Sequence, residues 1–393
     1  MVELILARLP TVDVIRSQLV CKRWKSIVRS PTFAYTSSKQ YFLRTPWLAM
    51  VPKSSPNQFM VYDTEVSKLR YIQQPHPPLL ISNSDSSTPV AACAGLMCFK
   101  YHTVNLFRLI VANPLTGLSH VLPELDVDIN QFPIMGIAMH ASNSLSHVDV
   151  DYKVYVTFGY SNPDLSLKVF SSEVKAWKDI RPLTHTAKAR LNVLDPKINL
   201  SGVATLGSEG QIIVNYFERF VGRSLIRFDI SKGTDLVKDI SLSSSWPDGT
   251  FRVEMLFCSG RIFTIFDRPM TILEPLSIFE LDTENYKLKP DPIAVFNHGK
   301  FAFVSSCTSH GDYIMVCLHT VLLSEYSIEV LMYNLKADEW THLPDGFKTN
   351  DLSLMHASSH AFLPDMQAKA YSSSALGFVA RKTCEIGDLS FNI

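Results

Sequence analysis

One short phrase recurs six times along the chain and constrains its fold more than any other feature. Each copy is an apolar stretch, a polar turn and a second apolar stretch, as in FMVYDTEVSKLRYI and VLMYNLKADEWTHLP. The copies align on one anchor residue each: Asp63, Asn113, Ser171, Asp229, Glu280 and Asn334. Successive anchors lie 50 to 58 residues apart. Because self-similarity at a near-constant period indicates one structural unit built several times, we expect an array of like units.

Each copy of the phrase is typical of a β-hairpin, because a tight polar turn joins two short apolar stretches. Six residues after the anchor, four copies place a large side chain: Leu69, Trp177, Tyr286 and Trp340. Hairpins repeated at this period are typical of a β-propeller, whose blades are four-stranded sheets. The hairpin is expected to join the third and outermost strands of a blade. Trp177 and Trp340 are then expected to pack within blades rather than to bind a ligand.

The inner strands of each unit are expected to precede the hairpin. The candidates carry a glycine or another small residue beside an apolar run, and they are residues 95–99, 135–140, 210–217, 260–266 and 311–319. The first unit shows no obvious fourth strand, whereas the tail has two spare strand-like segments, HASSHAFLP and SALGFVA. We therefore expect the tail to complete the first unit, since ring closure removes the open sheet edges.

The N-terminal segment has the pattern of short helices instead. Ile15 and Leu19 lie four residues apart, and Val20, Trp24 and Ile27 continue an apolar stripe at helical spacing. The basic residues that fall between these positions are expected to face water: Lys22, Arg23, Lys25 and Arg29. Pro10 and the Ser30-Pro31 pair are helix breakers. Helices this short cannot bury a stable core alone, so a partner or the next domain should cover part of the stripe.

A family resemblance extends this interpretation. The residues that carry it are Leu9, Pro10, Val14, Arg16, Val20, Cys21, Lys22, Trp24, Ile27, Ser30, Pro31 and Phe33. In this order they resemble the F-box, the helical module that docks a substrate receptor onto the Skp-type adaptor of a cullin-RING ubiquitin ligase. The family's domain opens with a further Leu-Pro and an acidic residue, so about ten residues of the module are expected to be missing on its N-terminal side.

Three phrases of the repeat resemble the kelch-like propellers of plant F-box proteins. They are CxGLxCF at Cys93 to Phe99, VxNPxTG at Val111 to Gly117 and YKVxxxFGY at Tyr152 to Tyr160. The resemblance implies two domains, an F-box over residues 1–45 that is incomplete at its N-terminus and a kelch-like β-propeller over residues 46–393. The expected fold is therefore a set of small all-α helices followed by an all-β, six-bladed propeller.

The resemblance also implies a function. The chain would be the substrate-recognition subunit of an SCF-type ubiquitin ligase, with the F-box on the adaptor and the propeller on a protein substrate. The adaptor-binding residues expected from motif position are Leu9, Pro10, Val14, Ile15, Leu19, Val20, Cys21, Lys22 and Trp24. Leu9-Pro10 and the Val20 to Lys22 run are the favoured contacts, while Trp24 and Ile27 are the favoured core residues. Substrate binding is expected on the propeller loops, which include residues 82–89, 140–149 and 241–249.

The sequence offers little for catalysis. It lacks the GxSxG, GxxxxGK[ST], HExxH and GxGxxG patterns that mark nucleophile, phosphate, zinc and dinucleotide sites. The twelve histidines are scattered, and the seven cysteines form no CxxC pair. The cysteines lie mostly in apolar runs, where the thiol behaves as a small hydrophobe. We therefore expect no catalytic residue, no metal and no cofactor.

Charge and hydropathy bound the partners and the location. Lys and Arg total 37 and Asp and Glu total 37, so no general attraction to nucleic acid is expected. The N-terminal segment is basic, but it lacks a stacking aromatic series and a recognised DNA-binding motif. No run of 18 apolar residues and no signal peptide is seen, which predicts no membrane association and a place in the cytoplasm or nucleus.

Two other classes of function stay open at this stage. The chain could be a propeller scaffold, for example a transcriptional or signalling cofactor, that binds partners without ligase function. It could also be a propeller hydrolase or oxidase, which would need acids or metal ligands that converge at the blade tops. The ubiquitin-ligase receptor remains the leading hypothesis.

Overall fold

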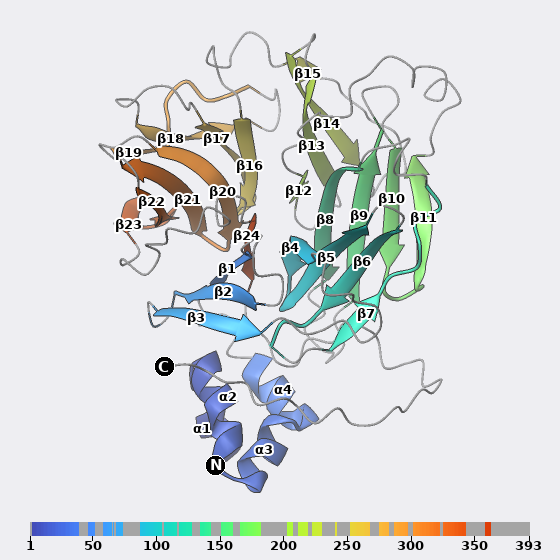
Figure 1. The fold of residues 1–393 in the computed structure, drawn as a ribbon, viewed down its shortest axis with the longest axis vertical. Helices are drawn as coiled ribbons and strands as arrows, with labels where there is room; N and C mark the ends of the chain where they lie inside the picture. Colours follow the sequence, from blue (N-terminus) through green and yellow to red (C-terminus); the bar gives the residue numbers. More distant parts are fainter. Residues whose placement is uncertain are drawn as a thin grey trace.

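The computed structural model has a small helical part at the N-terminus and a larger part made of strands (Figure 1). The residues that it describes are 2–38, 46–51, 58–64, 66, 68–73, 87–103, 106–115, 118–127, 134–142, 151–159, 166–181, 203–206, 211–218, 222–229, 240–241, 252–267, 275–282, 287–297, 302–322, 325–342 and 358–362.

The helical part consists of α1 (Val2–Leu6), α2 (Thr11–Val20), α3 (Lys22–Val28) and α4 (Pro31–Ser38). Two of the predicted breaks lie where expected. Pro10 precedes α2, and Pro31 opens α4, where its fixed φ suits a first helical position. The Ser30 hydroxyl caps α4 by accepting the Phe33 backbone N–H at 3.1 Å.

The apolar stripe predicted through this region is interrupted at Cys21. That residue is extended, with φ −161° and ψ 162°, and it separates α2 from α3. Its Sγ atom accepts the backbone N–H of Trp24 at 3.5 Å, so the thiol serves as the cap of α3. The stripe therefore runs over two helices that point in different directions, which the spacing alone did not reveal.

The strands form six four-stranded antiparallel sheets. The first three sheets contain, in spatial order, β24 (Ser358–Phe362), β1 (Trp47–Val51), β2 (Gln58–Asp63) and β3 (Lys68–Gln73); β4 (Ser87–Cys93), β5 (Leu96–Thr103), β6 (Leu106–Ala112) and β7 (Ser119–Val121); and β8 (Ile134–Ser142), β9 (Asp151–Phe158), β10 (Ser166–Ser171) and β11 (Ala176–Arg181).

The other three sheets follow the same order. They contain β12 (Val203–Leu206), β13 (Gln211–Glu218), β14 (Gly222–Asp229) and β15 (Ile240–Ser241); β16 (Arg252–Cys258), β17 (Arg261–Asp267), β18 (Leu276–Leu281) and β19 (Ala294–Phe296); and β20 (Ala302–His310), β21 (Tyr313–Leu322), β22 (Glu325–Asn334) and β23 (Glu339–His342). Apart from the first, each sheet is therefore built from four consecutive strands.

The sheets are arranged in a ring. The first strand of each sheet contacts the first strand of the next, in the order β24, β4, β8, β12, β16 and β20, and β20 contacts β24 again. Figure 1 shows these strands toward the middle of the larger part, with the other strands of each sheet outside them. The larger part is thus a β-propeller, as the repeat predicts.

The six anchor residues lie where the hairpin prediction places them, at the end of the third strand of each sheet. Two of them show why an amide or a carboxylate suits this position. The side chain of Asn113 accepts the backbone N–H of Leu115 at 2.9 Å. The side chain of Asn334 accepts the backbone N–H groups of Lys336 at 3.0 Å and Ala337 at 3.2 Å. Such local hydrogen bonds fold the chain into the turn before the outermost strand.

The five candidate inner strands all precede the hairpin of their sheet, as expected. Residues 135–140 lie in the innermost strand β8, and the other four segments lie in second strands. The expected order of strands holds less well in one respect. In the fifth sheet the outermost strand is Ala294–Phe296, later than the predicted position of Tyr286, which lies outside the described residues. Between β18 and β19 the chain makes an isolated bridge, Leu281 with Leu288. A longer loop therefore delays the outer strand here.

Glycines precede second strands for a backbone reason. In the turns β4–β5 and β16–β17 both central residues have positive φ, namely Ala94 (44°) with Gly95 (77°) and Ser259 (49°) with Gly260 (76°). Positive φ at both positions defines the type I′ hairpin turn, which favours glycine. The glycine in these two candidate segments therefore marks the turn into a second strand.

The tail completes the first sheet. Strand β24 pairs antiparallel with β1, from Trp47 opposite Phe362 to Val51 opposite Ser358. Its residues belong to the HASSHAFLP segment, so the predicted closure by the tail is confirmed. The other spare segment, residues 374–380, lies outside the described residues.

The core lies between neighbouring sheets. One cluster joins the second and third sheets around Tyr152 and Phe170, and another joins the fifth and sixth sheets. The Trp177 ring lies 5.5 Å from that of Phe170, and its indole N–H donates to the Pro123 carbonyl at 2.8 Å. Trp340 packs on Tyr333 at 5.1 Å between ring centroids. Both tryptophans are thus packing residues, as predicted.

Removal of residues 351–393 should unfold the propeller. The truncation deletes β24, whose five residues pair with β1, and each lost backbone hydrogen bond costs about 1 kcal/mol. We expect the loss of a cooperative melting transition by circular dichroism. A control truncation after residue 370, which keeps β24, should melt like the full chain. A soluble, cooperatively melting 1–350 protein would contradict ring closure by the tail.

Candidate functional site

The four helices pack around a small apolar core of their own. Its buried residues are Leu6, Ala7, Val14, Val28 and Phe33. Three half-buried residues that carry the family resemblance, Leu9, Trp24 and Ile27, pack against this core. Trp24 and Ile27 therefore pack against the core of the helices, as the sequence favours. Residues from all four helices meet in this cluster, so the helices form one module, hereafter the helical module (residues 2–38).

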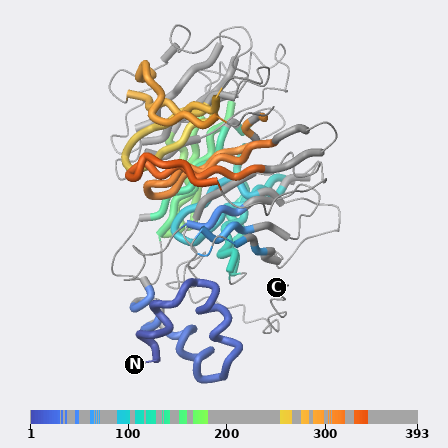
Figure 2. The backbone as a smooth tube through the Cα atoms, turned by 90° about the vertical axis from the view of Figure 1, so that its left-hand side faces the viewer, coloured from blue at the N-terminus to red at the C-terminus, as the bar shows by residue number. Residues whose placement is uncertain are grey.

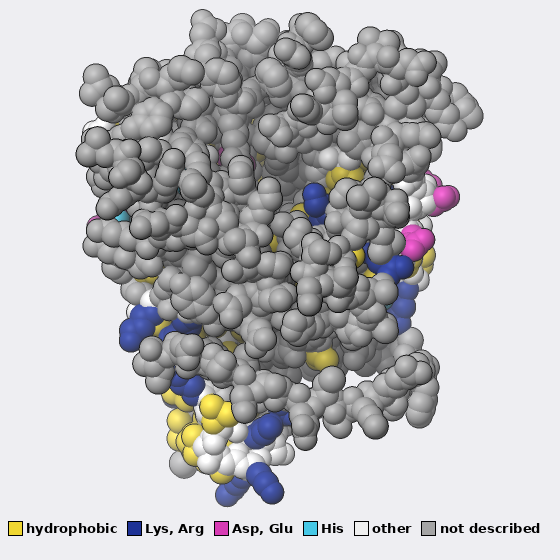
Figure 3. All heavy atoms as spheres, viewed as in Figure 1, with side chains coloured by type: hydrophobic (Ala, Val, Ile, Leu, Met, Phe, Trp, Pro, Cys, Tyr) yellow, Lys and Arg dark blue, Asp and Glu magenta, His cyan; other side chains and the backbone are white. Residues whose placement is uncertain are grey.

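The helical module exposes large apolar side chains. Leu4 and Ile5 of α1 are 58% and 56% exposed, and Leu19 and Val20 of α2 are 79% and 65% exposed. Single exposed apolar side chains are normal on a folded protein, whereas a contiguous apolar patch marks an interaction surface. Figure 3 shows hydrophobic side chains gathered over the helical module, with Lys and Arg side chains beside them. We refer to Leu4, Ile5, Leu19 and Val20 as the exposed apolar set.

The residues after α2 add polar and basic groups to this surface. Cys21 and Lys22 are exposed, and so are the basic side chains predicted to face water: Arg23, Lys25 and Arg29. Arg29 reaches back to α2, where its Nε donates to the Gln18 side chain at 3.4 Å. The helical module therefore exposes both apolar and basic side chains, a composition that suits a partner with an apolar patch and acidic residues.

The nine predicted adaptor-binding residues divide into three groups in the structure. Leu19, Val20, Cys21 and Lys22 are exposed, and Leu9, Pro10 and Trp24 are half-buried. Val14 and Ile15 are only 3% and 6% exposed. Val14 belongs to the core of the helical module, and Ile15 to a cluster shared with the propeller.

Burial thus removes Val14 and Ile15 from the side chains that an outside partner can reach in this fold. The reason is that α2 lies between two layers, the other helices and the propeller. A helical apolar stripe in the sequence does not tell which of its members a neighbouring domain covers.

Two exposed residues were not selected from the sequence. Leu4 and Ile5 lie in the VELIL segment of α1, before the motif residues that carry the family resemblance. The signal that could have identified them is an apolar pair next to Leu6, since a five-residue helix can bury only one side. The structure adds these two residues to the candidate surface.

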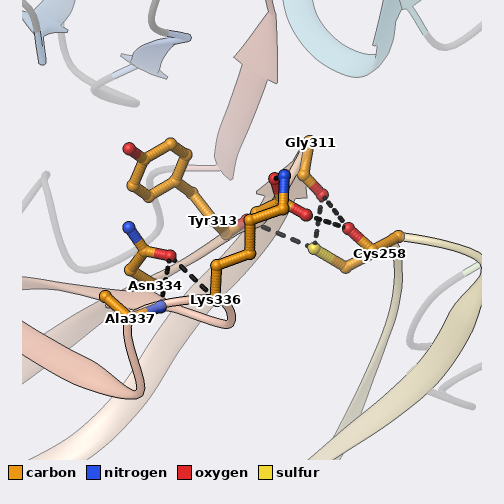
Figure 4. Close-up of polar contacts among 8 residues, drawn as sticks. Cys258, Gly311, Tyr313, Asn334, Lys336 and Ala337 are labelled. Atoms are coloured by element: carbon orange, nitrogen blue, oxygen red, sulfur yellow. Dashed lines mark hydrogen bonds and ion pairs between the residues drawn. The ribbon is translucent and has the colours of Figure 1, made fainter.

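The propeller carries one compact polar cluster, which joins the turns of the fifth and sixth sheets (Figure 4). The Cys258 thiol donates to the Gly311 carbonyl at 2.9 Å, and the Ser259 hydroxyl bonds the Asp312 carboxylate at 2.5 Å. The ammonium of Lys336 lies 2.5 Å from the other carboxylate oxygen of Asp312. These contacts tie the β16–β17 turn to the β20–β21 and β22–β23 turns.

The chemistry of this cluster is structural. Burial, with the Asp312 charge beside it, raises the pKa of the Cys258 thiol to about 12, so it stays protonated at neutral pH and is a poor nucleophile. The hydrogen bonds from Lys336 and Ser259 hold the pKa of Asp312 below its usual range, so it stays ionised. A protonated thiol and a paired carboxylate connect two sheets but provide neither a nucleophile nor a free base.

The described residues include no group of ligands for a metal ion. Within these ranges, no three His, Cys, Asp or Glu side chains are placed together as a metal ion requires. No helix in the described part of the chain is long and apolar enough to span a membrane. Of the loops expected to bind substrate, residues 82–86, 143–149 and 242–249 lie outside the described residues.

Comparisons with known proteins agree with this division into two parts. A model of the F-box domain matches residues 1–35. F-box only protein 13 of Arabidopsis thaliana is 25% identical over 392 residues, which cover 93% of this chain and 83% of that protein. An F-box/kelch-repeat protein of Arabidopsis thaliana is 26% identical over 185 residues, which cover 45% of this chain and 43% of that protein.

Among solved structures, that of YjhT is similar with a TM-score of 0.43 and 10% identity, over 76% of this chain and 94% of that one. The helical module, the ring of sheets and the sequence relatives lead to one description. A model of the F-box domain matches the N-terminus of the chain, its relatives include plant F-box and F-box/kelch-repeat proteins, and its larger part is a β-propeller.

Proposed function

We propose that this chain is the substrate-recognition subunit of an SCF-type cullin-RING ubiquitin ligase. The observation that carries the proposal is the F-box match over residues 1–35, on a module whose exposed apolar set has no cover within the described residues. An F-box domain implies a Skp-type adaptor as partner. The propeller is then the part that holds the protein to be ubiquitinated.

The proposed adaptor contact centres on four consecutive residues, Leu19 to Lys22, and also includes Leu4 and Ile5. Burial of one exposed Leu, Val or Ile side chain against a partner gains about 1.5–3 kcal/mol before the cost of association. The exposed apolar set supplies four such side chains. Leu9 and Pro10, which are half-buried, stay in the proposed contact at its edge. Val14 and Ile15 are buried, so they support the contact only by packing within the fold.

The propeller is proposed to be six-bladed and kelch-like, with each four-stranded sheet as one blade. The contact order of the innermost strands supports a ring of six, and the three kelch-like phrases lie in the second and third sheets. A closed ring presents the loops between strands on a rigid support, which suits the selection of a protein substrate. The loop residues that choose the substrate are expected among 82–89, 140–149 and 241–249.

The proposed contribution to ubiquitin transfer is positional. A receptor that holds a substrate beside a charged conjugating enzyme raises the effective concentration of the reacting groups without a catalytic group of its own. The protonated Cys258 and the paired Asp312 fit a non-catalytic receptor. The proposed place of action is the cytoplasm, the nucleus or both.

A double substitution on the exposed apolar set tests the adaptor contact. Leu19→Ala with Val20→Ala should lower adaptor recovery in co-precipitation about tenfold, since two apolar side chains lose most of their buried area. The helical signal in circular dichroism should stay, because both residues are exposed. The matched control is Val174→Ala, which removes a 70% exposed valine from the propeller. Equal recovery from the double variant and the control would refute the assigned contact.

A second experiment separates the receptor from a propeller scaffold or transcriptional cofactor that lacks ligase function. Proteins that co-purify with the intact chain are identified, and their half-lives are measured with and without inhibition of cullin activation. The receptor proposal expects at least one bound protein to become longer-lived under inhibition, and the Leu19→Ala, Val20→Ala variant to have the same effect. Unchanged half-lives for all bound proteins would favour the scaffold.

A further inference from the structure

Helix α2 is buried on more than one side. Thr11, Val12, Val14, Ile15 and Ser17 are all buried, whereas an ordinary surface helix buries a single stripe. Positions three apart lie on the same side of a helix, so Val12 and Ile15 share one side. Val14 is two positions from Val12 and therefore lies on a different side. The helix is thus held between two neighbours.

The two sides belong to different clusters. Val14 packs in the core of the helical module with residues of α1, α3 and α4. Val12 and Ile15, which are 2% and 6% exposed, belong instead to a cluster with residues of the first two sheets. The propeller members are Trp47, Ala49, Val61, Met97, Phe99, Ala112 and Leu115. Figures 1 and 2 both place the helical module beside the end of the propeller that carries β1, β2 and β3.

Leu115 is the propeller residue that makes this contact informative. It lies in the turn after β6, where its backbone N–H is fixed by the Asn113 side chain at 2.9 Å. Turn side chains are ordinarily open to water, yet Leu115 is only 7% exposed. It shares its cluster with Val12 and Ile15, so the helical module provides cover for an apolar turn of the propeller.

The row of Val12 and Ile15 continues to Leu19, one turn further along α2. Leu19 is 79% exposed, so the cover given by the propeller ends between Ile15 and Leu19. This row of α2 side chains is therefore divided. Val12 and Ile15 pack against the propeller, whereas Leu19 remains exposed and available to a partner.

We propose that Val12 and Ile15 are positioning residues that seat the helical module on the first two sheets of the propeller in one orientation. Its consequence, that the adaptor and the substrate are held in a fixed relation, rests on the proposed function; the seat itself does not. The module is then a rigid extension of the propeller, although residues 39–45, which join the two parts, are outside the described ranges. The two apolar side chains fix the orientation of the helical module on the propeller, as a stiff linker would.

Hydrogen–deuterium exchange of the full chain tests the seat from both of its sides. Val12→Ala with Ile15→Ala opens the contact from the helix, and Leu115→Ala opens it from the propeller. Each change should speed exchange of the α2 amides about tenfold or more, because local opening no longer has to break the apolar contact. The double variant should also speed exchange in β6 and the turn after it. Ile15→Val, made in place of the alanine changes, keeps most of the apolar surface and should leave the α2 amides protected from exchange.

Arg16→Ala is the matched control, because Arg16 is an exposed residue of the same helix and alanine favours helix. If the double variant also deprotects α3, the helical module itself has loosened, and Leu115→Ala decides, since it leaves the module's sequence intact. Unchanged α2 exchange in Leu115→Ala would overturn the proposal. Adaptor binding is measured in parallel and should be unchanged in Leu115→Ala. A wild-type chain that fails to bind adaptor would count against the proposed function and leave the exchange result to decide the seat.

Discussion

The pairing of β24 with β1 is the contact on which the rest of the structure depends. It joins residues 358–362, from the C-terminal part of the chain, to β1 in the first sheet, so every sheet then has a neighbour on both sides. The apolar clusters lie between neighbouring sheets, and a ring left open would expose one of those interfaces to water. The same closure holds β1 and β2, which supply Trp47, Ala49 and Val61 to the seat of α2.

The two parts of the chain are therefore coupled through one helix. The closed ring fixes the first two sheets, these cover Val12 and Ile15, and the helices pack on the opposite side of α2 around Val14. What remains outside is the end of α2 and the turn to α3, with α1 contributing Leu4 and Ile5. The propeller packs against Val12 and Ile15 of α2, and the other helices pack against Val14. These two sets of contacts separate the receptor part of the chain from the docking part.

Much of this arrangement could be predicted from the sequence. The repeat gave the propeller and the hairpins, and the anchors Asn113 and Asn334 lie at turns that their side chains hold by hydrogen bonds. The spare tail segment gave the closing strand. These features are local in sequence or repeated, so each copy of the pattern supports the others.

The rest depended on contacts between distant segments, which periodicity does not contain. Val14 and Ile15 are neighbouring members of the predicted adaptor-binding set, yet one packs against the helices and the other against the propeller. Cys21 ends α2 with an extended backbone, and its thiol caps the start of α3, which no residue pattern indicated.

The exchange footprint of purified adaptor on the intact chain tests the docking surface most directly. New protection is expected at residues 2–6 and 19–25, where the exposed apolar set and basic residues lie. No change is expected at residues 11–15, which the propeller and the other helices already cover. Protection confined to the propeller, or no protection at an adaptor concentration that saturates a known F-box protein, would contradict the proposed docking surface.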